Sequence, residues 1–337
     1  MTAPVLTFFN NKGGVGKTSL VYHLAWMLSD MGRRVVAIDL DPQANLTSAF
    51  LEEAALEALW EPPGGPQPGS TIFQCLKPLT EMGDIAAPAS QTIQPGLHLV
   101  PGDLALARLE GLLSQEWGNA LGTTANARAF RVLSGFWQVA QMAAAQHGAD
   151  LVLADVGPSL GAINRSALIA TDHVVVPLAA DMYSLQGLRN LGPTLRDWRA
   201  DWQQRVAGWK QPTFALPAGH MQPLGYVLMQ HIERLSRPVA AYRKWADRIP
   251  ATYAESVLQQ GLDTRAQPID GHCLARLKHY RSLAPMAQEV HKPIFALTAA
   301  DGAIGSHAAA VRDAYSDFKA LAVAVLERIE PDFQSVA

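Results

Sequence analysis

Cysteine is scarce in this chain of 337 residues, which contains only Cys75 and Cys273. Two cysteines are too few for a disulfide scaffold, a four-cysteine zinc site or an iron–sulfur cluster held within one chain. A strong excess of one charge is also lacking, because 27 Lys and Arg stand against 30 Asp and Glu, for a formal net charge of −3. This balance argues against a wholly basic nucleic-acid-binding protein, although it leaves room for a local basic patch.

Long hydrophobic runs are absent as well. No apolar stretch approaches the ~18 residues that a membrane span requires, and the opening residues MTAPVLTFFN lack the pattern of a signal peptide. We therefore expect a cytoplasmic protein that does not contact a membrane. Hydrophobic residues make up 49% of the chain and charged residues 17%, a composition that can bury a core and that excludes wholesale disorder.

A glycine-rich segment near the start predicts a phosphate-binding loop. The β-rich residues 5–10 precede Asn11-Lys-Gly-Gly-Val-Gly-Lys-Thr18, here called the phosphate loop, and residues 19–31 follow with apolar side chains at helical spacing that Gly32 would end. Strand, glycine-rich loop and helix form the context in which backbone N–H groups and a helix N-terminus cradle phosphates. We expect the nucleotide to be bound by Gly13, Gly14, Val15, Gly16, Lys17, Thr18 and Ser19.

Two side chains of the phosphate loop carry the expected chemistry. Lys17 would reach the β- and γ-phosphate oxygens, and the Thr18 hydroxyl would ligate Mg²⁺. The alternative is a glycine-rich turn beside a surface lysine. It does not account for the agreement of the loop, the Lys-Thr pair and both flanking elements.

Three aspartates end two apolar runs. In Arg34-Val-Val-Ala-Ile-Asp39-Leu-Asp41 the two carboxylates stand at i and i+2, so they project toward the same side of a strand end. Residues 150–155 predict a second strand, which ends in Asp155, and residues 156–161 form what we call the phosphate-sensing turn. Ligands of open parallel sheets bind outside the carboxyl ends of the strands, so these carboxylates would meet phosphate, Mg²⁺ or water. Asp41 could alternatively cap a helix that begins at Pro42.

These segments resemble the deviant Walker A ATPases of the ParA/MinD type, and among them the ParA-like partition and positioning ATPases. Lys12-Gly-Gly-Val-Gly-Lys-Thr18 fits the family pattern KGGxGK followed by Ser or Thr, with Asn11 where the general motif has glycine. Asp39-Leu-Asp-Pro-Gln-Ala-Asn45 is similar to the family's DxDPQxN, and Asp155-Val-Gly-Pro-Ser-Leu-Gly161 to its DxxPSLG. The resemblance covers residues 5–50 and 149–192 well and residues 282–325 moderately.

The resemblance implies an enzyme that hydrolyses ATP with Mg²⁺ and works as a homodimer with ATP sandwiched between two subunits. Lys12 would then bind the nucleotide of the partner subunit, and the ordinary alternative is a solvated lysine. Asp41 would orient or activate the attacking water, so the expected catalytic residues are Lys12, Lys17 and Asp41. The expected metal-site residues are Thr18, Asp39 and Asp155, with Asp39 supporting the magnesium shell.

The function implied by the resemblance is plasmid or chromosome partition, or the positioning of another cargo. In the ATP state the protein would bind non-specific DNA and so associate with the nucleoid, and a partner protein would stimulate its slow hydrolysis. A second hypothesis is an ATP-switched regulator or assembly factor that acts through a protein partner without binding DNA. A third is a P-loop ligase or transferase for a small molecule, against which Lys12 argues.

Strands that alternate with helices predict an α/β fold, with a doubly wound, mostly parallel sheet flanked by helices. We expect residues 1–337 to form a single P-loop ATPase domain, with a Pro/Gly-rich excursion at residues 61–70 and a family-specific insertion around residues 230–280. Further expected elements are a helix over 128–147, strands over 173–178 and 223–229, and a last helix over 306–329.

The C-terminal third carries a local excess of positive charge. Residues 196–292 contain 14 Lys and Arg against 8 Asp and Glu. ParA-like proteins bind DNA through basic residues in this part, whereas the alternative is an ordinary solvated face. Trp198, Trp202, Trp209 and Trp245 favour a helix core over a platform for stacking bases. The acidic, proline-interrupted residues 327–337 argue against a membrane-binding helix, and no helix-turn-helix domain is expected before the first strand.

Overall fold

The computed structural model describes residues 2–121, 126–231, 233–234, 237–238, 240–260, 270–280 and 282–330. Part of the expected insertion, residues 261–269, lies outside the described residues, and so do residues 331–337 of the acidic end.

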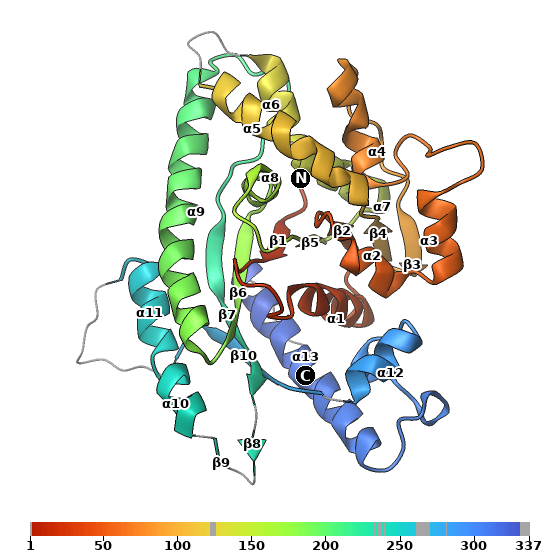
Figure 1. The fold of residues 1–337 in the computed structure, drawn as a ribbon, viewed down its shortest axis with the longest axis vertical. Coiled ribbons are helices and arrows are strands. Elements are labelled where there is room, and N and C mark those ends of the chain that lie inside the picture. The colour runs from red at the N-terminus through yellow and green to blue at the C-terminus, as the bar shows by residue number, and fades with distance from the viewer. Residues whose placement is uncertain are drawn as a thin grey trace.

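An eight-stranded sheet forms the centre of the fold (Figure 1), in the order β10-β7-β6-β1-β5-β2-β4-β3. Neighbouring strands are parallel except for β3, which runs antiparallel to β4 at one edge. The expected α/β fold with a mostly parallel sheet is therefore confirmed. The strands are β1 Val5–Phe8, β2 Val35–Asp39, β3 Gln91–Gln94, β4 Leu97–Val100, β5 Leu151–Asp155, β6 His173–Ala179, β7 Gln222–His231 and β10 Cys273–Lys278.

The register of the central strands places two of the expected carboxylates side by side. Strands β2 and β5 pair from Val35 opposite Leu151 to Asp39 opposite Asp155. Both strands are buried along their whole length, as expected for parallel strands that are covered on both faces. Asp39 and Asp155 are consequently held at the same edge of the sheet, in the floor of the candidate site.

Helices cover both faces of the sheet. On one face, α1 packs with α2, α12 and α13 in one hydrophobic cluster; on the other, α4 to α9 and α11 pack in a second cluster. Figure 1 shows α9 running along one side of the molecule, with α5 and α6 near one of its ends. The helices of these two layers include α1 Lys17–Asp30, α5 Glu110–Asn119, α6 Ala127–Leu133, α7 Gly135–His147, α8 Ala162–Ile169, α9 Met182–Gly208, α11 Ile249–Ser256, α12 Leu283–Glu289 and α13 Ser306–Ile329.

Shorter elements complete the chain. They include α2 Asn45–Phe50, α3 Glu53–Trp60, α4 Ile72–Leu76, α10 Ala240–Ala246, the two-stranded ribbon of β8 Glu233–Arg234 with β9 Arg237–Pro238, and the 3₁₀ turns η1 Lys77–Glu81, η2 Leu104–Leu109, η3 Ile294–Ala296 and η4 Ala299–Asp301. Residues 61–70 connect α3 and α4 without helix or strand. None of the helices in the described part of the chain is long and apolar enough to cross a membrane.

The helical structure expected over residues 128–147 is confirmed except for one break, at Ser134. The chain forms α6 and α7, which meet at Ser134, where the backbone leaves helical geometry with φ −90° and ψ 2°. The Ser134 hydroxyl donates a hydrogen bond to the Phe130 carbonyl at 2.6 Å, and such side-chain bonds compete with helix continuation. Gly135 follows, where a Cβ would lie 2.8 Å from Leu76 of α4. The break thus lets α7 approach α4 closely. The helix expected over residues 306–329 is confirmed.

Candidate nucleotide-binding site

The phosphate loop connects β1 to α1 at the carboxyl edge of the sheet (Figure 1). Gly14 and Gly16 adopt left-handed backbone conformations, with φ +71° and +81°. Residues other than glycine rarely adopt these conformations. Gly16 also precedes the first residue of α1, and a Cβ there would lie 2.8 Å from the Cε methyl of Met229 in β7. Backbone geometry therefore favours glycine at this position, and a side chain there would also displace the end of Met229.

The side chain of Lys17 folds back over the phosphate loop. Its ammonium group donates hydrogen bonds to the carbonyl oxygens of Asn10 at 3.2 Å and Lys12 at 3.3 Å. The residue is only 7% exposed, and this burial lowers the pKa of Lys17, against an opposing effect of Asp155 and Asp41. A bound anion would stabilise the charged form, because it supplies the countercharge that burial withholds.

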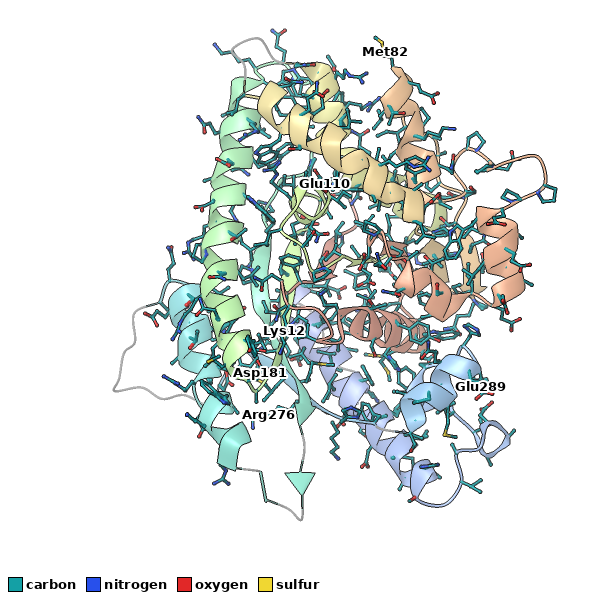
Figure 2. The ribbon with its side chains drawn as sticks, viewed as in Figure 1. Lys12, Met82, Glu110, Asp181, Arg276 and Glu289 are labelled. Carbon is teal, nitrogen blue, oxygen red and sulfur yellow. The ribbon has the colours of Figure 1, made fainter. Side chains whose placement is uncertain are left out.

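The side chain of Lys12 forms an ion pair with Asp181, the residue before α9 (Figure 2). Asp181 also accepts a hydrogen bond from the Ser184 amide at 2.8 Å, which caps α9. Burial alone would raise the pKa of Asp181, but Lys12 and Ser184 outweigh it and hold that pKa below its usual value. Lys12 is thus engaged within its own chain at the rim of the phosphate loop.

Asp39 is fully buried and accepts three hydrogen bonds. One oxygen accepts from the Thr47 amide at 2.8 Å and the Thr47 hydroxyl at 2.7 Å, and the other from the Asp41 amide at 3.2 Å. Burial raises the pKa of Asp39 to about 6, although these hydrogen bonds oppose the rise. Because Thr47 lies in α2, Asp39 fastens that helix to the end of β2.

Asp155 is also fully buried, but neither of its carboxylate oxygens has a hydrogen-bond partner. Burial, and then the neighbouring Asp39, raise the pKa of Asp155 well above its usual value. The Thr18 hydroxyl partly offsets this rise, without forming a hydrogen bond of ordinary geometry. An unsatisfied buried carboxylate costs free energy unless a cation compensates it.

The unsatisfied oxygens of Asp155 fit a Mg²⁺ ion held together with the Thr18 hydroxyl. Magnesium prefers oxygen ligands and keeps several water or phosphate oxygens when it binds to proteins. Within the described ranges, no group of three or more His, Cys, Asp or Glu side chains could hold a metal ion by itself. The remaining ligands would consequently be phosphate oxygens and water.

Asp41 faces the phosphate-sensing turn. It is 8% exposed, and a Cβ on Gly157 would lie 3.2 Å from its Oδ1 atom. The same oxygen accepts a hydrogen bond from the Gln43 amide at 3.0 Å. The next helix, α2, begins only at Asn45, so Asp41 does not cap a helix that begins at Pro42.

Several polar residues at the site were not expected from the sequence. Asn10 accepts a hydrogen bond from the Lys12 amide at 2.9 Å and donates one to the Pro177 carbonyl of β6 at 2.7 Å. Asn10 stands at the end of a buried strand, directly before the phosphate loop, so its position was a signal that could have been used. Glu110 and Asn164 hold α8 and the phosphate-sensing turn, but no local sequence pattern connects them to the loop.

A cavity of about 340 Å³ opens beside the phosphate loop. It extends from Thr18 and Ser19 along α1 to residues 284–294, and is lined by Tyr22, Ser48, Gln288 and Lys292 among others. His23 joins the same elements, because its Nδ1 lies 2.7 Å from the Ser19 carbonyl and its Nε2 accepts from the Ile294 amide at 3.1 Å. Burial lowers the pKa of His23 to about 4, so the ring is neutral at pH 7.

Part of the C-terminal positive charge is used inside the fold. Arg196 donates to the Ser256 carbonyl at 2.7 Å, Arg199 to the His220 carbonyl at 2.6 Å and Arg205 to the Trp117 carbonyl at 3.0 Å. Among the described residues of 196–292, six other basic side chains are exposed: Lys210, Arg243, Lys244, Arg248, Arg276 and Lys278.

The tryptophans of this region pack in the core, as expected. Trp202 and Trp209 are buried, and Trp198 and Trp245 are partly buried against the same hydrophobic cluster.

Comparison with known proteins supports the resemblance. A family model described as an AAA domain matches residues 3–207, more than half of the chain. The chromosome-partitioning ATPase Soj of Thermus thermophilus is 31% identical over 201 residues, which cover 58% of this chain and 63% of Soj. The chromosome partitioning protein ParA of Caulobacter vibrioides is 31% identical over 202 residues, covering 60% and 66%. The match therefore spans a little under two thirds of these relatives.

Solved structures share the fold over nearly the whole chain. A protein of Corynebacterium diphtheriae has a TM-score of 0.73 at 23% identity, and covers 98% of this chain and 100% of its own. An McdA–ATP complex from Cyanothece has a TM-score of 0.62 at 17% identity, with 100% and 99% covered. At this identity the structures establish the fold alone. The family match places this chain in the family described as an AAA domain, and within it the chain is similar to the ParA-like partition ATPases.

Proposed function

We propose that this chain is an ATP-binding and ATP-hydrolysing dimerisation switch of the ParA type, built as one P-loop domain, that partitions or positions DNA or another cargo. The observation that carries the proposal is the fully buried Asp155, whose oxygens have no partner and which faces Thr18 of the phosphate loop. Such a carboxylate next to a glycine-rich loop fits a nucleotide with Mg²⁺ better than it fits a purely structural role.

The residues of the site divide the work of phosphoryl transfer. The amides of the phosphate loop and Lys17 bind the phosphates, and Thr18 with Asp155 holds Mg²⁺, which neutralises charge on the phosphate oxygens when bound. Asp39 supports this arrangement from behind, because its hydrogen bonds fix the end of β2 and the start of α2. Asp41 orients the attacking water, since it is nearly buried and faces the phosphate-sensing turn.

The adenosine part of ATP would occupy the cavity of about 340 Å³ beside Ser19. The cavity begins at the phosphate loop, so one ligand could fill both. Two proteins of the same fold are nucleotide complexes: the McdA complex contains ATP, and a putative plasmid partition protein from Borrelia burgdorferi was crystallised with AMPPNP.

The ATP-bound form would be a homodimer in which Lys12 binds the nucleotide of the partner subunit. Lys12 lies at the rim of the phosphate loop, where a second subunit could approach. To reach that nucleotide, Lys12 must leave Asp181 of its own chain. The trans lysine would add positive charge during phosphoryl transfer, as an arginine finger does in GTPases.

In this state the protein would bind non-specific DNA, through exposed side chains such as Arg243, Lys244 and Arg248. Non-specific binding has dissociation constants of about 10⁻⁴–10⁻⁶ M at physiological salt. Pairing two such surfaces in a dimer can raise the affinity by about 10²–10⁴-fold. ATP would thus place the protein on the nucleoid, in the cytoplasm, and hydrolysis stimulated by a partner protein would release it.

One observation favours a second function. Arg196, Arg199 and Arg205 donate to carbonyl groups of their own fold, so less positive charge is available for DNA than the composition suggests. An ATP-switched regulator or assembly factor that acts through a protein partner would not need that charge.

Retention on non-specific duplex DNA distinguishes these functions. The Asp41→Ala variant should bind ATP without hydrolysing it, so it is applied to immobilised DNA with ATP or with ADP across a salt titration. Lys17→Ala, which should not bind nucleotide, is the control. Retention that requires ATP and weakens steeply with salt supports the DNA function. If the variant dimerises with ATP but is not retained, the function without DNA is favoured.

A further inference from the structure

The carboxylate of Glu110 binds the N-terminus of α8, directly after the phosphate-sensing turn. Glu110 is the first residue of α5 (Figure 2). Its Oε1 accepts a hydrogen bond from the Ala162 amide at 2.6 Å, and its Oε2 accepts one from the Ile163 amide at 3.0 Å. A carboxylate at this end of a helix satisfies free amides and interacts favourably with the helix dipole.

This contact depends on the last residue of the turn. A Cβ on Gly161 would lie 2.6 Å from Oε1 of Glu110, closer than such atoms can approach. Gly161 has an ordinary φ of −75°, so a larger residue here would displace the Glu110 carboxylate without straining the backbone. The turn and Glu110 are therefore matched to one another.

The remainder of the phosphate-sensing turn is held by Asn164, in the first helical turn of α8. Its amide nitrogen donates to the Gly157 carbonyl at 2.9 Å and to the Ser159 carbonyl at 2.7 Å. Gly157 is the residue that faces Asp41. A displacement of α8 would thus be passed through Asn164 to the part of the turn next to the expected catalytic carboxylate.

A second contact joins α5 to α8, two helical turns beyond Glu110. The guanidinium group of Arg165 in α8 lies 4.1 Å from the centre of the Trp117 ring in α5. Stacking of this kind is favourable because the cation interacts with the face of the ring. Glu110 and Trp117 together fix α8 against α5.

We propose that Glu110 is a positioning residue for ATP recognition and hydrolysis, acting through the amides of α8 on the phosphate-sensing turn. The inference rests on the proposed function, because it assumes that the turn detects the γ-phosphate. Glu110 holds α8 in the position that allows Gly157 and Asp41 to contact the γ-phosphate at the same time. ADP lacks the γ-phosphate, so its binding does not depend on this alignment.

The test compares Glu110→Gln with the wild-type protein. Glutamine keeps the size of the side chain but places an NH₂ group against a backbone N–H. Gly161→Ala is a second, independent variant, since its Cβ displaces the carboxylate without removing it. Glu53→Gln makes the same chemical change in the exposed first turn of α3 and is the matched control. For each protein, equilibrium titration with Mg²⁺ gives the affinities for ATP and ADP, steady-state assays give kcat and KM, and thermal unfolding gives the stability.

We expect Glu110→Gln and Gly161→Ala to lower kcat, and the preference for ATP over ADP, by about 10- to 100-fold. Losses of this size are typical of residues that orient the groups in direct contact with a ligand. Affinity for ADP and the Glu53→Gln control should stay at wild-type values, and the lost hydrogen bonds at the N-terminus of α8 should lower the unfolding temperature by only a few degrees. In a Glu110→Ala background Gly161→Ala should add little, because both act through one contact.

Two results overturn the inference while leaving the proposed function intact. One is an unchanged kcat and ATP preference in both variants. The other is a loss of ADP affinity as large as the loss of ATP affinity, which would assign Glu110 a general structural role. A wild-type protein that binds neither nucleotide would instead refute the proposed function itself.

Discussion

Replacing Asp155 by asparagine should raise the free energy of unfolding of the nucleotide-free protein. In the presence of Mg²⁺ and ATP, the same variant should be less stable than the wild type. Asparagine has nearly the same shape, and neither oxygen of Asp155 accepts a hydrogen bond that the change would break. An unsatisfied buried polar group costs about 1–3 kcal/mol, and more when charged. Because the amide is itself unpaired, we expect Asp155→Asn to raise the free energy of unfolding of the nucleotide-free protein by about 1–2 kcal/mol at pH 7.

The size of this gain should depend on pH. Burial and Asp39 raise the pKa of Asp155 well above the model-compound value of 3.8. Below that value the carboxyl group is neutral in both the folded and the unfolded chain, so it does not disfavour folding. As the pH rises toward the higher pKa of the folded state, the unfolded chain releases its proton first and folding becomes less favourable. The difference between variant and wild type should widen over this interval.

Mg²⁺ and ATP should reverse the order of stability. A ligand at 100 times its dissociation constant stabilises a protein by about 2.7 kcal/mol. The wild type should gain this amount, and Asp155→Asn much less, because the metal loses its carboxylate. Urea denaturation followed by the fluorescence of the eight tryptophans, first with EDTA and then with Mg²⁺ and ATP, measures both effects. A variant that is less stable than the wild type in EDTA, or that gains as much from ligand, would refute this account of the site.

Three further predictions concern the phosphate loop, the backbone and a buried histidine. Lys17→Ala should abolish ATP binding in equilibrium titrations, and an unchanged affinity would contradict the assignment of the loop. Met82 is 85% exposed with φ +64°, so in urea denaturation Met82→Gly should be more stable than Met82→Ala by about 1 kcal/mol; equal stabilities would argue against backbone strain there. Because burial lowers the pKa of His23 from 6.5 to about 4, the unfolded chain binds a proton first as the pH falls over that range. The free energy of unfolding should drop by roughly 3 kcal/mol, whereas His23→Phe should show a flatter pH profile.

The parts of the site that could be predicted from the sequence are those in which neighbouring residues share one task. Asp39 ends one strand and Asp41 stands two residues further on, while Lys17 and Thr18 end the phosphate loop. Within each pair, the short spacing in the sequence was enough to place both side chains at the site. The ends of the central strands could also be predicted, because each apolar run stops where the polar residues begin.

Contacts between distant segments could not be predicted in this way. Glu110 reaches Ala162 across 52 residues of sequence, and nothing in the run around Glu110 marks it as a partner of α8. The break at Ser134 depends on the hydrogen bond from the Ser134 hydroxyl to a carbonyl group of the preceding helix. It also depends on the close approach of Gly135 to α4. Tertiary packing determines both, and hydrophobic periodicity carries no information about either.

The contact between Gly16 and Met229 has a mechanical consequence. The phosphate loop and β7 are separated by more than two hundred residues in the sequence. The end of the Met229 side chain nevertheless occupies the space that a Cβ atom at position 16 would need. The strand leads directly into residues 230–280, the segment in which this chain departs most from the expected pattern. The thioether end of methionine is flexible, so small movements of the strand can be taken up by rotation of this side chain. The strand that enters the most divergent segment of the chain thus packs against the phosphate loop through a soft, apolar contact.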